Sequence, residues 1–239
     1  MLPAYNAART VQATVADIPP GTVDEIILID DGSHDDTVRV ARELGITVIV
    51  HPSNRGYGGS QKTAYQAALE TGADVIVMLH PDYQYDPSLI PYFVGFIRRD
   101  VCDVMLGCRI RTRSEALKGG MPIIKYLVNR ALTITANVVL GQNLGEFHSG
   151  FRVYRRSVLE RVPFERNDDE FVFDFQFLTQ AAALGFRLGD APMPTRYFTE
   201  ASSIGMREGV RYAAGVLATL ARFLLHNGGL RSWELLTPK

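Results

Sequence analysis

The sequence is poor in cysteine, in net charge and in long uninterrupted apolar runs. Its two cysteines, Cys102 and Cys108, form neither a metal-ligand pair nor a disulfide framework, which favours a reducing compartment. The formal net charge of −1 argues against nucleic acid as a partner. The start shows no secretory signal, and no apolar run reaches the roughly 18 to 20 residues that span a bilayer. We therefore expect a cytoplasmic protein.

Apolar residues make up 46% of the 239 residues, which is ample for a buried core. Strand and helix patterns alternate through the first hundred residues. This order predicts an α/β fold, a mostly parallel Rossmann-like sheet with helices on both faces. The expected strands are 25–29, 47–50, 74–79 and 103–106, and the expected helices are 8–17, 35–44, 60–71 and 87–99.

The pattern changes beyond residue 107. A long helix pattern at 123–140 precedes a loop at 141–152, a helix near 173–184 and a strand near 194 that enters a polar loop. An amphipathic helix and tail at 207–239 complete the chain. The apolar stripe of this helix, from Val210 to Leu225, packs against its own domain or a second subunit, or else lies along a membrane surface.

Two expected strands end in polar side chains. One runs into Asp30 and Asp31, the other into His80, Asp82 and Gln84. Ligands of open α/β sheets bind beyond the carboxyl ends of the strands, so we expect both groups at one edge. The donors at 80, 82 and 84 can converge on a cation, either Mg²⁺ or Mn²⁺, with the imidazole favouring Mn²⁺. The alternative for each group is an ordinary hydrogen-bonded corner.

A glycine-rich stretch at 54–62 lies between a strand and a helix. Gly56 allows close backbone approach, and the helix start with Lys62 in its first turn would suit a phosphate. A structural turn explains the same residues equally well. The stretch lacks the ending of a P-loop.

Together these motifs resemble family 2 of the nucleotide-sugar-dependent glycosyltransferases, which have the GT-A fold, over nearly the whole chain. Pro3-Ala4-Tyr5-Asn6 is similar to the opening motif, and Asp30-Asp31-Gly32-Ser33 to the base-binding motif. His80-Pro81-Asp82-Tyr83-Gln84 stands in place of the metal motif Asp-X-Asp-X-Gln, with His80 where the family usually has aspartate. Ser149-Gly150-Phe151-Arg152 resembles a segment of the polyprenyl (dolichyl) phosphate mannosyl- and glucosyltransferases.

The resemblance implies a role for each matching residue. Residues implied to bind the nucleotide sugar are Pro3, Tyr5, Asn6, Asp30, Asp31, Gly56, Lys62 and Asp82, and those implied to hold the metal are His80, Asp82 and Gln84. Residues implied to act on the acceptor are Arg109, Arg130, Glu146 and Arg152. The loop beyond residue 194 often closes over the donor in this family, which makes Arg196 and Ser203 candidates for the diphosphate.

The charge of the acceptor separates two mechanisms. A phosphate monoester has a second pKa near roughly 6 and is already a nucleophile, so it needs arginines more than a base. A hydroxyl acceptor needs a general base, which would be Glu146 or one of the acids at 168–170. Arg152 has a structural alternative, as an anchor between helix and loop.

We expect an inverting transfer of a hexose from a GDP-mannose or UDP-glucose type of donor to a polyprenyl phosphate at the inner face of a membrane. The catalytic domain would be 1–206, with a nucleotide-binding half at 1–107 and an acceptor half at 108–206, and a homodimer is compatible with the helical stripe. The alternatives are transfer to a hydroxyl in polysaccharide or glycolipid synthesis, and a nucleotide-sugar-binding protein without turnover.

Overall fold

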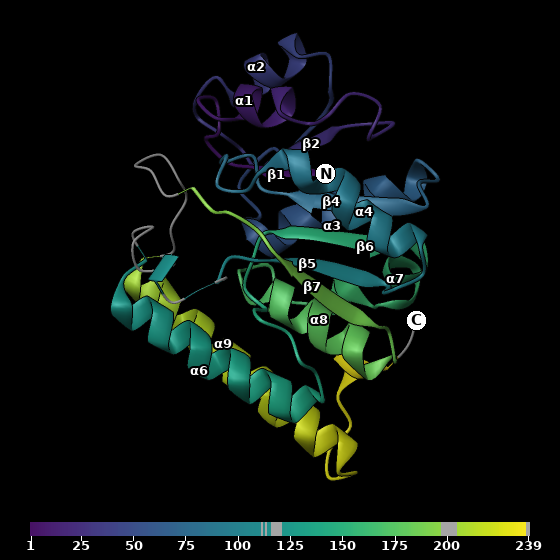
Figure 1. The fold of residues 1–239 in the computed structure, drawn as a ribbon, viewed down its shortest axis with the longest axis vertical. Helices are drawn as coiled ribbons and strands as arrows, with labels where there is room; N and C mark the ends of the chain where they lie inside the picture. Colours follow the sequence, from purple (N-terminus) through teal and green to yellow (C-terminus); the bar gives the residue numbers. More distant parts are fainter. Residues whose placement is uncertain (111, 113, 116–120, 197–204, 238–239) are drawn as a thin grey trace.

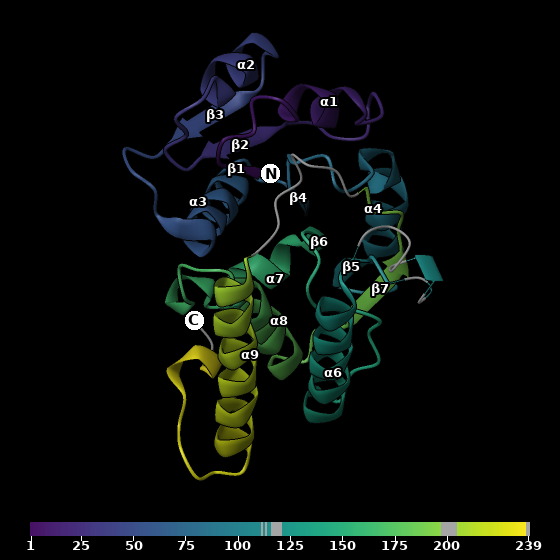
Figure 2. The same cartoon turned by 90° about the vertical axis from the view of Figure 1, so that its left-hand side faces the viewer.

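The computed structural model describes residues 1–110, 112, 114–115, 121–196 and 205–237 (Figures 1 and 2). Its strands form two hydrogen-bonded sets that meet at Met1. The amine of Met1 donates to the carbonyl oxygen of Val77 at 2.7 Å, and the amide of Leu79 donates to the carbonyl oxygen of Met1 at 3.1 Å. This is the ladder of a parallel pair, so β1 lies between β2 and β4.

Across this junction the strand order is β3-β2-β1-β4-β6-β5-β7. Only β6 runs antiparallel to its neighbours among these strands, so the predicted mostly parallel sheet is confirmed. The strands are β1 (Leu2–Ala4), β2 (Ile27–Asp30), β3 (Thr47–Val50), β4 (Val75–Leu79), β5 (Val104–Cys108), β6 (Phe151–Arg155) and β7 (Leu188–Pro192).

Helices cover both faces of the sheet (Figure 1). Ile76 and Met78 of β4 point to a core with α3 and α8, whereas Leu79 points to a second core with α4. Burial on both faces explains why the strands read as unbroken apolar runs. The helices are α1 (Val11–Ala16), α2 (Thr37–Glu43), α3 (Gly56–Glu70), α4 (Ile90–Arg98), α6 (Ile123–Leu140), α7 (Arg156–Arg161), α8 (Phe173–Ala183) and α9 (Met206–Asn227).

Two expectations about strands are wrong. The loop expected at 141–152 ends early, because Phe151 and Arg152 begin β6. This strand is buried but contains two arginines, so its sequence does not read as an apolar run. The strand expected near 194 is β7, which ends at Pro192, and Thr195 adds only an isolated bridge to Tyr85. Because β7 pairs with β5, the two proposed halves share one sheet.

The expectation about membrane-spanning runs also needs correction. By length and composition α6 could cross a membrane, with a mean hydropathy of 1.3 and 28% of it buried. Lys125 and Arg130 interrupt the apolar run in the sequence, but the helix is apolar on average. α6 packs alongside α9 (Figure 2).

The turn into α3 yields a prediction about stability. At Gly58 a Cβ would collide with the backbone carbonyl of Asp168, so we expect Gly58→Ala to lower the free energy of unfolding by about 1–3 kcal/mol. Gly95 in α4 has no atom within 4 Å of that position, and Gly95→Ala should raise the free energy by about 0.5–1 kcal/mol. Urea denaturation of both variants checks the pair; equal effects would contradict the packing.

Candidate functional site

The carboxyl ends of β2, β1 and β4 form one edge, as the sequence predicts. Ala4 is in register with Asp30, and the loops that follow β1 and β2 are joined by hydrogen bonds. The amide of Asn6 donates to Ser33 Oγ at 2.8 Å, and Asn6 Oδ1 accepts from the amide of His34 at 2.9 Å. Tyr5 is half exposed beside this junction, where a planar base could stack on it.

The two aspartates at the carboxyl end of β2, Asp30 and Asp31, are already engaged within the protein. Asp31 Oδ1 accepts from the amide of Arg55 at 2.8 Å and lies 2.7 Å from His51 Nδ1. Asp30 Oδ2 accepts from the amide of Ser33 at 3.1 Å, while its Oδ1 is buried with no hydrogen-bond partner among the described residues. The carboxylates are thus held in place at the edge.

One of the three expected metal donors, His80, has a ring nitrogen engaged within the protein. His80 Nε2 lies 2.8 Å from the Tyr57 hydroxyl, and the His80 ring lies so close to Gly150 that a Cβ there would collide with it. Burial lowers the pKa of His80 and favours a neutral imidazole. Since this nitrogen is committed to Tyr57, the candidate ligands are Asp82 and Gln84. Asp82 Oδ1 accepts from the amide of Gln84 at 3.1 Å.

This donor set fits an ion shared with a diphosphate. Within the described part of the chain, no group of three or more His, Cys, Asp or Glu side chains could hold a metal. Mg²⁺ and similar hard cations commonly use one or two protein carboxylates and complete their shell with phosphate oxygens and water. Asp82 and Gln84, both buried at the mouth of the sheet, match that arrangement.

The residues expected to bind phosphate at the glycine-rich turn have partners within the protein. Lys62 Nζ lies 2.7 Å from Asp169 Oδ1 and also donates to the carbonyl oxygen of Asn167. The amide of Gly58 donates to the carbonyl oxygen of Asp169 at 2.6 Å, and a Cβ at Gly56 would lie 2.5 Å from the same oxygen. The turn therefore holds the acidic loop at 168–170.

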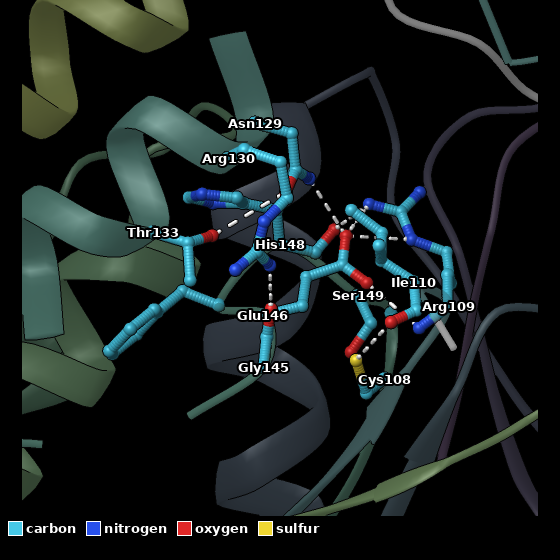
Figure 3. Close-up of polar contacts among 12 residues, drawn as sticks. Cys108, Arg109, Ile110, Asn129, Arg130, Thr133, Gly145, Glu146, His148 and Ser149 are labelled. Carbon is cyan, nitrogen blue, oxygen red and sulfur yellow. Dashed lines mark hydrogen bonds and ion pairs between the residues drawn. The ribbon is translucent and has the colours of Figure 1, made fainter. Parts of the chain in front are cut away.

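The second polar cluster surrounds Glu146, which is fully buried (Figure 3). Its carboxylate accepts from the amide and the Nε of Arg109, both at 2.9 Å, and from Asn129 Nδ2 at 2.9 Å. Burial alone would raise the pKa of Glu146, but the charge and hydrogen bonds of Arg109 lower it below its ordinary value. Arg130 donates to the carbonyl oxygen of Gly145 on the other side of Glu146.

Lys125 belongs to the same neighbourhood. Partial burial and then the charge of Arg109 lower its pKa, while Glu146 opposes them. Of the cations in this neighbourhood, Arg109 pairs with the Glu146 carboxylate and Arg130 binds the adjacent Gly145 carbonyl, so the neighbourhood carries more positive than negative charge. Lys125, Asn129 and Arg130 come from the first two turns of α6, and Arg109 follows β5.

Arg152 anchors the interior and does not face an acceptor. Its side chain is 0% exposed, forms an ion pair with Asp174 Oδ1 at 2.9 Å and donates to the carbonyl oxygens of Ser149 and Phe147. Asp174 Oδ2 also accepts from the Tyr57 hydroxyl at 2.7 Å. The structure therefore supports the anchoring alternative for this arginine.

The sequence analysis missed several residues of these networks. Tyr57, Asp174, Lys125 and Asn129 each touch or approach a predicted residue. A usable signal existed for Asp174, since an acid among aromatic residues of a buried helix requires a cation. Ser203 lies outside the described residues.

The family follows from a comparison with known proteins. A model of glycosyl transferase family 2 matches residues 1–162, so the chain belongs to that family. It is similar to a UDP-N-acetylglucosamine–dolichyl-phosphate N-acetylglucosaminyltransferase of Methanococcus voltae, with 26% identity over 82% of this chain and 84% of the relative. Similarity to an undecaprenyl-phosphate mannosyltransferase of Micrococcus luteus reaches 23% identity over 81% of each chain.

Solved structures show the same fold. Glucosyl-3-phosphoglycerate synthase from Mycobacterium tuberculosis, in complex with UDP, has a TM-score of 0.70 at 22% identity over 100% of this chain and 84% of its own. The same enzyme in complex with Mn²⁺, UDP and glucosyl-3-phosphoglycerate has a TM-score of 0.68 at 21% identity, over 97% of this chain and 79% of its own. The resemblance to GT-A glycosyltransferases is thereby confirmed.

The anchoring role of Arg152 predicts a large loss of stability on substitution. Arg152→Gln leaves Asp174 buried without its cation, so we expect the free energy of unfolding to fall by about 3–5 kcal/mol. Arg39→Gln removes an exposed arginine that pairs with Asp36 and Glu43 and should change it little. Urea denaturation measures both; a small effect of Arg152→Gln would refute the anchor.

Proposed function

We propose that the protein transfers a hexose from a nucleotide-diphosphate sugar to a polyprenyl phosphate, with inversion at the anomeric carbon. One observation carries the proposal: α6 supplies cations to the Glu146 cluster and exposes an apolar face. Ile124 and Val138 of this helix are 75% and 78% exposed. A lipid-linked phosphate has the same two properties, a charged head and an apolar chain.

The Glu146 cluster suits a phosphate nucleophile. Arg109 is fixed by Glu146, and its Nη2 also donates to the carbonyl oxygen of His148 at 2.9 Å. Because the side chain is already ordered, little conformational entropy is lost when a phosphate binds to it. Arg130 and Lys125 add charge beside it. A phosphate dianion bound there needs no proton removed before it attacks the anomeric carbon.

The same geometry argues against a hydroxyl acceptor. Glu146 would be its general base, but the carboxylate is fully buried, ionised and surrounded by N–H donors. A base must reach the proton that it removes. The acids at 168–170 are held against the α3 turn, with Asp169 paired to Lys62.

The donor would lie at the edge formed by β1, β2 and β4. Tyr5 would stack on the base, Pro3, Asn6, Asp30 and Asp31 would shape its pocket, and Asp82 with Gln84 would hold Mg²⁺ or Mn²⁺. The ion would neutralise the charge of the leaving diphosphate. The similarity to a dolichyl-phosphate and an undecaprenyl-phosphate transferase supports the acceptor class. We place the catalytic domain in the cytoplasm, peripheral to the inner face of the membrane.

The acceptor assignment is tested by Arg130. With Mn²⁺, UDP-glucose or GDP-mannose, and polyprenyl phosphate, we expect Arg130→Gln to reduce transfer by about 10- to 100-fold, since one charge-assisted contact to the phosphate is lost. Arg130→Lys should retain part of the activity, and donor affinity should be unchanged. Full activity of Arg130→Gln, or transfer to phosphoglyceric acid but not to the lipid, would contradict the proposal.

The apolar face of α6 is tested by vesicle binding. Ile124→Glu combined with Leu127→Glu introduces charge at two exposed positions of α6 and should reduce co-sedimentation with lipid vesicles by at least about tenfold. Tyr92→Glu places a charge on the exposed side of α4, away from α6, and serves as the matched control (Figure 1). Equal binding of both variants would exclude α6 as the membrane contact.

A further inference from the structure

Tyr83 has an unusual backbone conformation between the two candidate metal ligands. Its φ of 59° lies in the left-handed region, which non-glycine residues seldom adopt. Across it, the Asp82 carboxylate accepts from the amide of Gln84 at 3.1 Å. The orientation of both candidate ligands therefore depends on Tyr83 keeping a left-handed backbone conformation, which is unfavourable unless the surrounding structure holds it.

Two contacts hold the Tyr83 side chain in place, and a third joins the two residues that make them. Its hydroxyl donates to the Asp17 carboxylate at the end of α1, and the Arg196 guanidinium lies 4.2 Å from the ring centroid. Arg196 Nη1 is also 3.8 Å from Asp17 Oδ2. Tyrosine, arginine and aspartate thus form a closed triangle, with a cation–π contact on one side.

Backbone contacts join the same segment to the metal motif. The amide of Arg196 donates to the carbonyl oxygen of Gln84 at 2.9 Å, and Thr195 forms a bridge with Tyr85. α1 adds a further support, because Thr14 Oγ1 donates to the carbonyl oxygen of Pro81 at 3.2 Å. Residues far apart in the sequence therefore meet on the loop that carries Asp82 and Gln84.

We infer that Tyr83, Arg196 and Asp17 are positioning residues, which keep Asp82 and Gln84 oriented for a divalent ion before the ion arrives. The inference rests on the proposed function, which places the ion at Asp82 and Gln84. Arg196 and Asp17 are 42% and 41% exposed, so the triangle adds little to the core and can be altered without unfolding the chain. The three residues act on the orientation of Asp82 and Gln84, as do other groups that orient metal ligands from outside the coordination shell.

The test measures Mn²⁺ affinity by isothermal titration calorimetry of the full chain, in the presence of saturating UDP or GDP. Arg196→Gln and Tyr83→Phe should each weaken Mn²⁺ binding by about tenfold. Arg196→Lys keeps the charge and should restore most of the affinity. Nucleotide affinity without metal and the melting temperature should stay close to those of the unmodified protein.

Tyr83→Gly separates the effect of the side-chain contacts of Tyr83 from the effect of its strained backbone conformation. Glycine adopts the left-handed conformation freely but has no side chain to contact Asp17 and Arg196, so we expect Mn²⁺ affinity to fall at least as far as in Tyr83→Phe. Arg39→Gln controls for loss of a positive charge, because Arg39 is an exposed residue of α2 that pairs with Glu43.

Two results would overturn the inference alone: unchanged Mn²⁺ affinity in Arg196→Gln and Tyr83→Phe, or an equal loss in Arg39→Gln. If the unmodified protein bound neither nucleotide with Mn²⁺, the metal assignment of the proposed function would fall, and the inference with it.

Discussion

A buried chain of polar groups fixes the geometry on which both candidate sites depend. Arg152 is fully enclosed, so its charge must be matched, and Asp174 matches it. Asp174 in turn orients Tyr57, whose hydroxyl reaches His80 at the end of β4. This series of polar contacts thereby connects β6, α8, α3 and the metal motif. It also gives a reason for the histidine: a second buried carboxylate beside Asp174 would repel it, whereas an imidazole kept neutral by burial does not.

The loop after β4 is contacted by elements from distant parts of the sequence. His80 is tied to α3, Tyr83 to α1 and to Arg196, and the Tyr85 hydroxyl accepts from the amide of Gly150 at 2.9 Å. Gly150 belongs to the loop that also carries Glu146. Under the proposed function, donor and acceptor groups are held by one continuous set of contacts, which suits a reaction that requires an aligned approach of nucleophile and anomeric carbon.

The sequence predicts the sheet and the edge at which the site lies, because burial on both faces makes strands legible as apolar runs. It fails where a residue's partner is distant in the chain. Lys62 and Gly56 have the chemistry of a phosphate turn, yet their partners are around residue 169. Arg152 has the chemistry of a phosphate clamp, yet Asp174 encloses it. No local pattern distinguishes a cation that awaits a ligand from one that already has a partner, since the difference lies in tertiary contacts.

α6 shows this limit in the opposite direction, because it has apolar residues on both its inward and its outward face. In a helix on the surface of a water-soluble protein, apolar residues face inward and polar residues outward. Leu132, Ala136 and Leu140 of α6 follow that rule and join the core, but Ile123, Ile124 and Val138 are more than 60% exposed. The buried Asn129 is explained by Glu146, which needs donors inside the protein. The outward apolar face has no partner among the described residues, and water is a costly neighbour for it. A lipid surface would remove that cost. Under the proposed function, the same helix would contact the membrane through its outward face and supply Arg130 beside the Glu146 cluster.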